Sequence, residues 1–207
     1  MFIIGVTGGT GSGKTTTIKK IEKDFGFNQI CFLSSDSYYK DNSNLDFKKR
    51  DQLNYDIPEA IDFDLLNSHV SILKEGMNIN VPVYCFSTHL RLKKTKIMSP
   101  KKILILEGIL IMTNEELRNK IDYSVFLDCS RDLRFKRRLE RDVKERNREF
   151  SDVINLFKNR LDQMHETYVE RVKKYCNIIL DTTDKTNLSE LTRVITVSYT
   201  HLTLPTI

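Results

Sequence analysis

The chain has 207 residues, of which 40% are hydrophobic and 29% charged, and its formal net charge is +5. This composition is typical of an ordinary globular protein, and the length favours a single domain. No stretch is long and apolar enough for a transmembrane helix and the first residues lack a signal-peptide profile, so we expect a cytoplasmic protein without a membrane partner. The modest charge favours an anionic small molecule over a nucleic acid as the partner. The 4 cysteines form no Cys-x-x-Cys pair, which predicts reduced thiols.

Residues 8–15 read Gly-Gly-Thr-Gly-Ser-Gly-Lys-Thr and match the phosphate-binding loop pattern G-x-x-x-x-G-K-[ST]. The apolar run 2–6 before the loop predicts a buried strand, and Ile18, Ile21 and Phe25 after it recur at helical spacing. Strand, glycine loop and helix are the arrangement that this motif needs. An ordinary glycine turn would not require Lys and Thr directly after the last glycine.

The chemistry of such a loop assigns roles to its residues. Glycines let backbone N–H groups converge on phosphate oxygens, and the helix N-terminus adds positive charge. Lys14 would reach the β- and γ-phosphates, and the Thr15 hydroxyl would bind Mg²⁺. The predicted nucleotide-binding residues are Gly8, Gly9, Thr10, Gly11, Ser12, Gly13, Lys14, Thr15 and Thr16.

Apolar runs typical of buried strands occur at 2–6, 29–33, 103–106, 123–127 and 177–180. Together they indicate an α/β protein of the P-loop NTPase class, with a five-stranded parallel sheet flanked by helices. Alternating residues between 78 and 98 predict a small antiparallel ribbon beside this sheet.

Helices are predicted at 59–75 and from Ser151 onward, and a capping box at 187–190 predicts a last short helix. The helix after Ser151 carries an apolar stripe at Val153, Phe157, Leu161, Met164, Tyr168 and Val172, which we interpret as facing the core. Residues 41–56 are polar and predict an exposed, irregular connection.

Two carboxylates follow predicted strands. Asp36 comes after the strand 29–33, and Glu107 comes directly after the strand 103–106. Because ligands bind beyond the carboxyl ends of parallel strands, both are expected near the phosphate loop. We predict that Glu107 is a second anchor for Mg²⁺, directly or through water. The alternatives are a helix-start residue at Glu107 and an N-cap or turn residue at Asp36.

The segment 131–148 is very basic, and its residues Arg134, Arg138 and Arg141 share one helix face. A solvated charged face is the usual outcome of such a run, and nucleic-acid binding has weak support because no stacking aromatics alternate with the arginines. A lid that closes over a triphosphate explains the cluster best, since arginine forks suit the charge of a transferring phosphoryl group. We therefore predict a lid at about 131–150 in a single domain spanning 1–196.

The tail 197–207 continues neither the strand nor the helix pattern of the preceding chain. It resembles translated sequencing-adapter text. We therefore predict that it is not native and leave it out of the expected fold.

Six pieces of sequence follow one another along the chain. They are the loop 8–15, Asp-Ser-Tyr-Tyr-Lys-Asp at 36–41, Asn-Tyr-Asp-Ile-Pro at 54–58, Pro-Val-Tyr at 82–84 with His89 and Arg91, Ile-Leu-Glu-Gly-Ile-Leu at 105–110, and the arginine-rich stretch 137–148. In this order they resemble the uridine/cytidine kinase family, a family of P-loop nucleoside kinases, over about residues 1–180. The whole set is far more specific than the phosphate loop alone.

The resemblance implies a kinase that uses Mg²⁺ and ATP to phosphorylate uridine, and cytidine as well, at the 5′-hydroxyl. By the same resemblance Asp36 is the general base, and Lys14, Arg141 and Arg146 act on the phosphates. Residues implied to hold the nucleoside are Tyr39, Asp56, Tyr84, His89, Arg138 and Arg148, and those for the metal are Thr15 and Glu107. The family is typically homotetrameric, so a homo-oligomer is expected.

Three positions depart from the family pattern. Asn147 stands where the family usually has Gly, and Leu156 where many members carry Gln near the base. Residues 181–184 read Asp-Thr-Thr-Asp where Pro-Arg-Gly-Gly is common, on the adenine side, so ATP and GTP both stay open as donors. The alternatives are a phosphoribulokinase-like sugar-phosphate kinase and a catalytically silent nucleotide-sensing or RNA-associated protein of the same fold.

Overall fold

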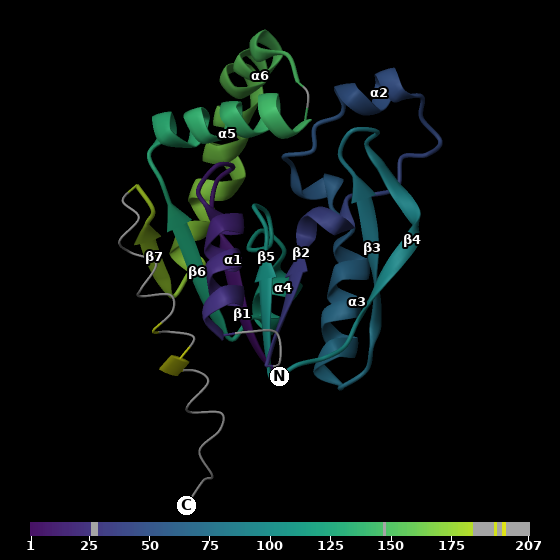
Figure 1. The fold of residues 1–207 in the computed structure, drawn as a ribbon, viewed down its shortest axis with the longest axis vertical. Coiled ribbons are helices and arrows are strands. Elements are labelled where there is room, and N and C mark those ends of the chain that lie inside the picture. The colour runs from purple at the N-terminus through teal and green to yellow at the C-terminus, as the bar shows by residue number, and fades with distance from the viewer. Residues whose placement is uncertain (26–28, 147, 184–192, 194–195, 198–207) are drawn as a thin grey trace, which may run out of the picture.

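The computed structural model describes residues 1–25, 29–146, 148–183, 193 and 196–197. Its centre is a parallel five-stranded sheet in the order β2-β5-β1-β6-β7. The strands are β1 (Phe2–Thr7), β2 (Ile30–Ser34), β5 (Ile103–Glu107), β6 (Tyr123–Asp128) and β7 (Ile178–Asp181). The predicted sheet is confirmed, and β1, which leads into the phosphate loop, is its middle strand (Figure 1).

Helices cover both faces of this sheet, which explains why its strands are apolar without alternation. On one face, α1 (Lys14–Phe25) contributes Ile18 and Ile21 to a buried cluster with Ile4 and Val6 of β1. On the other face, α3 (Phe63–Lys74) and α4 (Glu115–Lys120) share a second buried cluster with Ile3 of β1. Successive strand residues thus alternate between two cores.

A separate two-stranded antiparallel sheet pairs β3 (Ile79–Cys85) with β4 (Leu90–Met98), which confirms the predicted ribbon. Its register shifts between Pro82 and Val83, where proline cannot donate to the ladder. Figure 1 shows the turn of this ribbon at the same end of the molecule as the carboxyl ends of the sheet strands. The turn can therefore contribute residues to a site at that edge.

Two predictions for the segment 41–75 were wrong. The helix expected at 59–75 begins at Phe63, because the Asp62 side chain caps it by accepting the N–H of Leu65. Pro58–Ala60 forms a separate 3₁₀ turn. The stretch 41–56, expected to be irregular, contains the short helix α2 (Phe47–Gln52).

The long helix expected from Ser151 is a helical run whose period changes. It consists of α6 (Phe150–Leu156), a π turn (Phe157–Leu161), α7 (Asp162–Met164), a second π turn (His165–Val169) and a 3₁₀ turn (Glu170–Tyr175). Because a π turn closes its hydrogen bond over five residues, the apolar stripe drifts from the 3.6 period. Val153, Phe157 and Leu161 are buried as predicted, but in the last turns Val169 is more buried than the predicted Tyr168.

The basic segment forms α5 (Arg131–Arg146), which Figure 1 shows lying across the carboxyl ends of the sheet strands together with α6. The predicted capping box at 187–190, Asn147 and residues 198–207 of the predicted tail lie outside the described residues. No helix in the described part of the chain is long and apolar enough to cross a membrane. All four cysteines are free thiols.

Candidate active site

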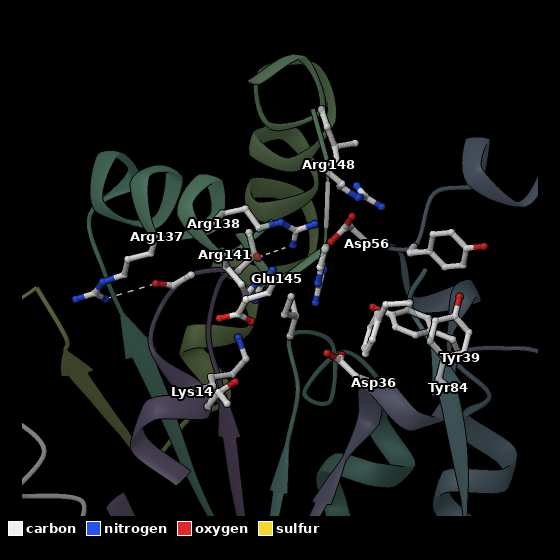
Figure 2. Close-up of a pocket in the computed structure, with 18 of the residues that line it drawn as sticks. Lys14, Asp36, Tyr39, Asp56, Tyr84, Arg137, Arg138, Arg141, Glu145 and Arg148 are labelled. Atoms are coloured by element: carbon white, nitrogen blue, oxygen red, sulfur yellow. Dashed lines mark hydrogen bonds between the residues drawn. The ribbon is translucent and has the colours of Figure 1, made fainter. Parts of the chain in front are cut away.

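A cavity of about 610 Å³ lies at the carboxyl edge of the sheet, with walls from α5 and from the β3–β4 ribbon. All of the predicted site residues line it except Gly8, Gly9 and Ser12. Figure 2 shows the arginines of α5 on one side, Tyr39 and Tyr84 on the other, and Lys14 and Asp36 below them. The fold thus brings residues from distant parts of the chain into one site.

The phosphate loop has a backbone that only glycine adopts easily. Gly8, Gly11 and Gly13 have φ angles of 142°, 76° and 96°. A Cβ on Gly8 would lie 2.4 Å from the carbonyl oxygen of Leu127, and a Cβ on Gly11 would lie 2.4 Å from that of Arg134. Substitution at either position would push the loop away from β6 or from α5.

Lys14 is buried beneath this loop. Its Nζ donates to the carbonyl oxygens of Gly8 at 2.8 Å and Gly9 at 3.0 Å. Burial lowers the pKa of Lys14 to about 8, although Glu107 and Asp36 favour its charged form. An arriving phosphate can replace the two carbonyls as the acceptor, and its negative charge would further favour the charged form of Lys14.

Glu107 ends β5 and lines the cavity beside the phosphate loop. The Ser34 hydroxyl donates to its Oε1 at 2.5 Å. Burial raises the pKa of Glu107 and the charge of Asp36 raises it further, while Lys14 opposes both. The next helix begins only at Glu115, so the alternative of a helix-start residue at Glu107 was wrong.

The residues predicted for the metal fit a Mg²⁺ ion. Thr15 and Glu107 offer oxygen ligands to the cavity, and a nearby cation would favour the ionised form of the buried Glu107 carboxyl. Within the described residues, no group of three or more His, Cys, Asp and Glu side chains is arranged to hold a metal ion.

Asp36 lies in a 3₁₀ turn (Ser35–Tyr38) that follows β2. The N-cap of this turn is Ser34, whose hydroxyl accepts the N–H of Asp36 at 3.3 Å, so Asp36 is not the cap. Its carboxylate is free to line the cavity, and its charge raises the pKa values of both Glu107 and Tyr39. Asp36 therefore lies between the phosphate end and an aromatic end of the same site.

The aromatic end consists of four rings. The Tyr39 and Tyr84 centroids are 5.0 Å apart, and Tyr55 stacks on His89 at 4.8 Å with 12° between the planes. Tyr39 and Tyr55 meet edge to face at 5.4 Å. Such rings provide a surface on which a flat base can stack.

Two titratable groups at this end have shifted pKa values. Burial lowers the pKa of His89, and the charge of Arg148 lowers it further. The carboxylate of Asp51, whose Oδ1 lies 3.5 Å from His89 Nε2, opposes this shift. The imidazole is therefore neutral at neutral pH. Burial raises the pKa of Asp56, and the Arg138 guanidinium is the main charge that opposes this shift.

Arg91 holds the Tyr39 backbone from outside the cavity. Its Nε and Nη2 donate to the carbonyl oxygen of Tyr39 at 3.1 and 2.8 Å. Its Nη1 donates to Asp62 at 3.0 Å. The β4 strand is thereby attached to the turn that presents Asp36 and Tyr39.

The arginines of α5 do not all face the cavity. Arg137, Arg138, Arg141 and Arg146 of α5 line it, as does Arg148 after the helix. Arg138 Nη1 donates to Thr10 Oγ1 at 2.7 Å. Arg134, predicted on the same face, packs beneath the phosphate loop and donates to the carbonyl of Cys129 instead. The predicted arginine face therefore divides into a supporting residue and cavity-lining residues.

Sequence reasoning missed several residues at the site. Tyr55 and Arg160 line the cavity, and the carboxylate of Asp142 contacts three of the arginines. Tyr55 and Asp142 lie inside matched sequence pieces but received no role. Arg160 lies in the helical run after Phe150, for which only the apolar stripe was interpreted, so no role was predicted for its polar residues.

A parallel sheet with a phosphate loop after its middle strand and an arginine-rich helix over that edge defines a P-loop kinase. The family described as Phosphoribulokinase / Uridine kinase family matches residues 3–189. The uridine kinase of Clostridium perfringens is 44% identical over 179 residues, which cover 86% of each chain. That of Staphylococcus epidermidis is 43% identical over 178 residues, again 86% of each chain.

The solved structure of phosphoribulokinase from Rhodobacter spheroides shares the fold, with a TM-score of 0.62 at 16% identity over 90% of this chain and 73% of that one. Together, the match to the family and the identity to its curated members extend over most of the chain. The chain belongs to the phosphoribulokinase/uridine kinase family.

Proposed function

We propose that this protein transfers the γ-phosphoryl group of a nucleoside triphosphate to the 5′-hydroxyl of uridine, and of cytidine as well. The observation that carries the proposal is the place of Asp36 in the cavity, between the Lys14 and Glu107 end and the aromatic end. The names of the similar curated proteins support uridine as the acceptor.

In the proposed reaction Asp36 orients the acceptor hydroxyl and takes its proton. The new bond joins the 5′-oxygen to the γ-phosphorus, and the bond from that phosphorus to the β,γ-bridging oxygen breaks. In a loose transition state, orientation of the nucleophile contributes more than proton removal. The nucleoside diphosphate then leaves with the bridging oxygen.

The remaining residues bind the two substrates. Lys14 would exchange its contacts with Gly8 and Gly9 for phosphate oxygens, and Arg141 and Arg146 would face the transferring group. Mg²⁺ at Thr15 and Glu107 would neutralise charge on the β- and γ-phosphates. We assign Asp56 and Arg138 to the ribose hydroxyls, because the carboxylate and the guanidinium interact across the cavity.

The base would stack among Tyr39, Tyr84 and His89, with Arg148 beside it. Leu156 also lines the cavity, where many relatives are expected to carry Gln. ATP is the proposed donor. On the proposed donor side, the Thr182 hydroxyl donates to the carbonyl oxygen of Ser12 at 2.8 Å. Arg137 Nη2 donates to the carbonyl oxygen of Thr182 at 3.1 Å.

We further infer a cytoplasmic location, since four free thiols suit a reducing compartment. A homotetramer remains the prediction from the family resemblance. We also keep the prediction of a single domain at 1–196 with a lid at about 131–150, and of a foreign tail after it.

A coupled assay of ADP release tests the proposal. Uridine and cytidine should support turnover, and ribulose 5-phosphate should not. ADP release with the sugar phosphate and with no nucleoside would favour the phosphoribulokinase-like alternative. ATP binding without turnover on any acceptor would favour a catalytically silent nucleotide-binding protein.

A further inference from the structure

Asp142 lies in α5 behind the arginines of the cavity. Its side chain is 0% exposed, and it is not among the described residues that line the cavity. Its Oδ2 accepts from Arg138 Nε at 2.5 Å and its Oδ1 from Arg141 Nε at 3.1 Å. Arg146 Nη1 lies 3.5 Å from the same Oδ1. One buried carboxylate therefore joins three guanidinium groups that come from successive turns of the helix.

The three arginines connect this carboxylate to both walls of the cavity. Arg138 continues to Thr10 of the phosphate loop, and the Arg146 guanidinium lies 4.7 Å from the centre of the Phe86 ring in the ribbon turn. The backbone of Asp142 also accepts the N–H of Arg148 at 3.1 Å. The Asp142 carboxylate thus contacts three cavity-lining arginines, and its backbone carbonyl contacts a fourth.

The carboxylate of Asp142 and the three guanidinium groups also interact through their opposite charges. Burial alone would raise the pKa of Asp142, but the guanidinium groups of Arg138, Arg141 and Arg146 lower it below its ordinary value, so the carboxylate stays ionised. Burial lowers the pKa of Arg146, and the charge of Arg141 lowers it further because the two guanidinium groups repel each other. The negative charge of Asp142 offsets this repulsion. Without the carboxylate, three like charges at close range would separate.

We propose that Asp142 is a positioning residue. It holds Arg141 and Arg146 in the geometry that the phosphates of the nucleotide meet, and it holds Arg138 between the phosphate loop and the acceptor end of the cavity. The inference rests on the proposed kinase function. Each guanidinium has five N–H donors, and Asp142 is within reach of one nitrogen of each. Most donors of these arginines thereby remain available to the two substrates. Asp142 acts on the reaction only through the arginines.

The first test replaces the carboxylate by its neutral isostere, in Asp142→Asn. We expect kcat to fall on the order of 10²-fold, the cost of a misplacement of about 1 Å. The Kd for ATP, measured by calorimetry without an acceptor, should rise about tenfold, and the uridine KM should rise as well because Arg138 also faces the acceptor end. The matched control is Asp132→Asn, on the same helix but 95% exposed, which should behave as wild type. Wild-type kcat and Kd in Asp142→Asn would overturn the proposal.

A double-mutant cycle separates positioning from a merely structural role. If Asp142 acts through the arginines, the losses of kcat and of ATP affinity caused by Asp142→Asn should be smaller in an Arg146→Ala background than in the wild type, because one of the three contacts is already absent. Equal losses in the two backgrounds would mean that Asp142 only stabilises the fold, and the proposal would be wrong.

If Asp142→Asn does not fold, Asp142→Glu takes its place. It keeps the charge but moves the carboxylate by one methylene, so ATP affinity should be near wild type while kcat stays at least about tenfold lower. Wild-type kcat in this variant would contradict the proposed geometry. Because the ATP Kd needs no acceptor, it tests Asp142 even if the wild-type protein phosphorylates no nucleoside, a result that would refute only the proposed function.

Discussion

The two ends of the cavity are built in different ways. The phosphate end consists of consecutive residues, 8–15, whose backbone is shaped by glycines with positive φ angles. The aromatic end consists of side chains from segments far apart in the sequence, such as Tyr39, Tyr84 and His89. We therefore expect that much of the triphosphate binding is encoded locally, because the backbone N–H groups of this loop converge and Lys14 belongs to it. Binding of the acceptor depends on how β2, β3 and the ribbon turn come together.

The two ends also meet. Arg138 donates to Thr10 of the phosphate loop and is the main opposing charge on Asp56 at the acceptor end. Asp36 lies between the ends and acts on the pKa values of Lys14 and of Tyr39. Substitutions at these shared residues and at residues of one end only can show how separate the ends are.

The largest expected effect is that of Asp36→Asn, which removes the proposed general base between the two ends. We expect kcat to fall by roughly 10²–10⁴, the usual contribution of a general base, with little change in ATP affinity. Asp64→Asn, an exposed carboxylate in α3, is the matched control. Steady-state ADP release together with ATP calorimetry makes the comparison, and normal turnover of Asp36→Asn would disprove its role as base.

Arg138→Ala tests whether the two ends are coupled. Because Arg138 makes charge-assisted contacts to Thr10 and Asp142 and faces Asp56, the KM values for ATP and for uridine should both rise, each roughly 10- to 100-fold. The exposed Arg171→Ala serves as control. A rise in only one of the two KM values would show that Arg138 belongs to one end alone.

Tyr55→Ala should act at the acceptor end only. Loss of the ring that stacks on His89 should raise the uridine KM about tenfold and leave the ATP KM unchanged. Tyr55→Phe keeps the ring and loses the hydroxyl, including its bond to the Arg50 carbonyl, so its effect should be milder. Tyr175→Ala, at a residue 46% exposed and away from the cavity, controls for removal of a tyrosine. Equal effects on both KM values would contradict the separation of the ends.

The smallest effect is a proton count at the phosphate end. The pKa of Lys14 is lowered to about 8 in the free protein, and bound phosphates should raise it again. At a pH between the pKa of Lys14 in the free protein and its higher pKa in the complex, Lys14 carries more of its proton when ATP is bound. ATP binding at about pH 8.5 should therefore take up a fraction of a proton from solution. Calorimetry in buffers of different protonation enthalpy measures this. In Lys14→Arg the side chain is always charged and the uptake should vanish; the same uptake in that variant would assign it elsewhere.

Much of the fold followed from local patterns. The buried strands, the antiparallel ribbon and the basic helix were predicted because burial on both faces, period-two alternation and a dense charge run each leave a signal in a few neighbouring residues. The predicted start of α3 was wrong because the sequence offers two plausible helix starts, one at Pro58 and one capped by Asp62, and the helix uses the second. The π turns after Leu156 were not predictable, since packing against the core sets their extra residues.

The sequence by itself determined that a phosphate loop follows a buried strand and that Asp36 and Glu107 lie at the carboxyl ends of two predicted strands. Those features depend on residue order and on the rule that parallel strands share a carboxyl edge. Only the tertiary structure decided that Arg134 supports the loop while Arg138 lines the cavity, that Tyr55 stacks on His89, and that Asp142 joins three arginines. The physical reason is that burial and the pairing of charges depend on which elements pack together, and a one-dimensional pattern does not contain those distances.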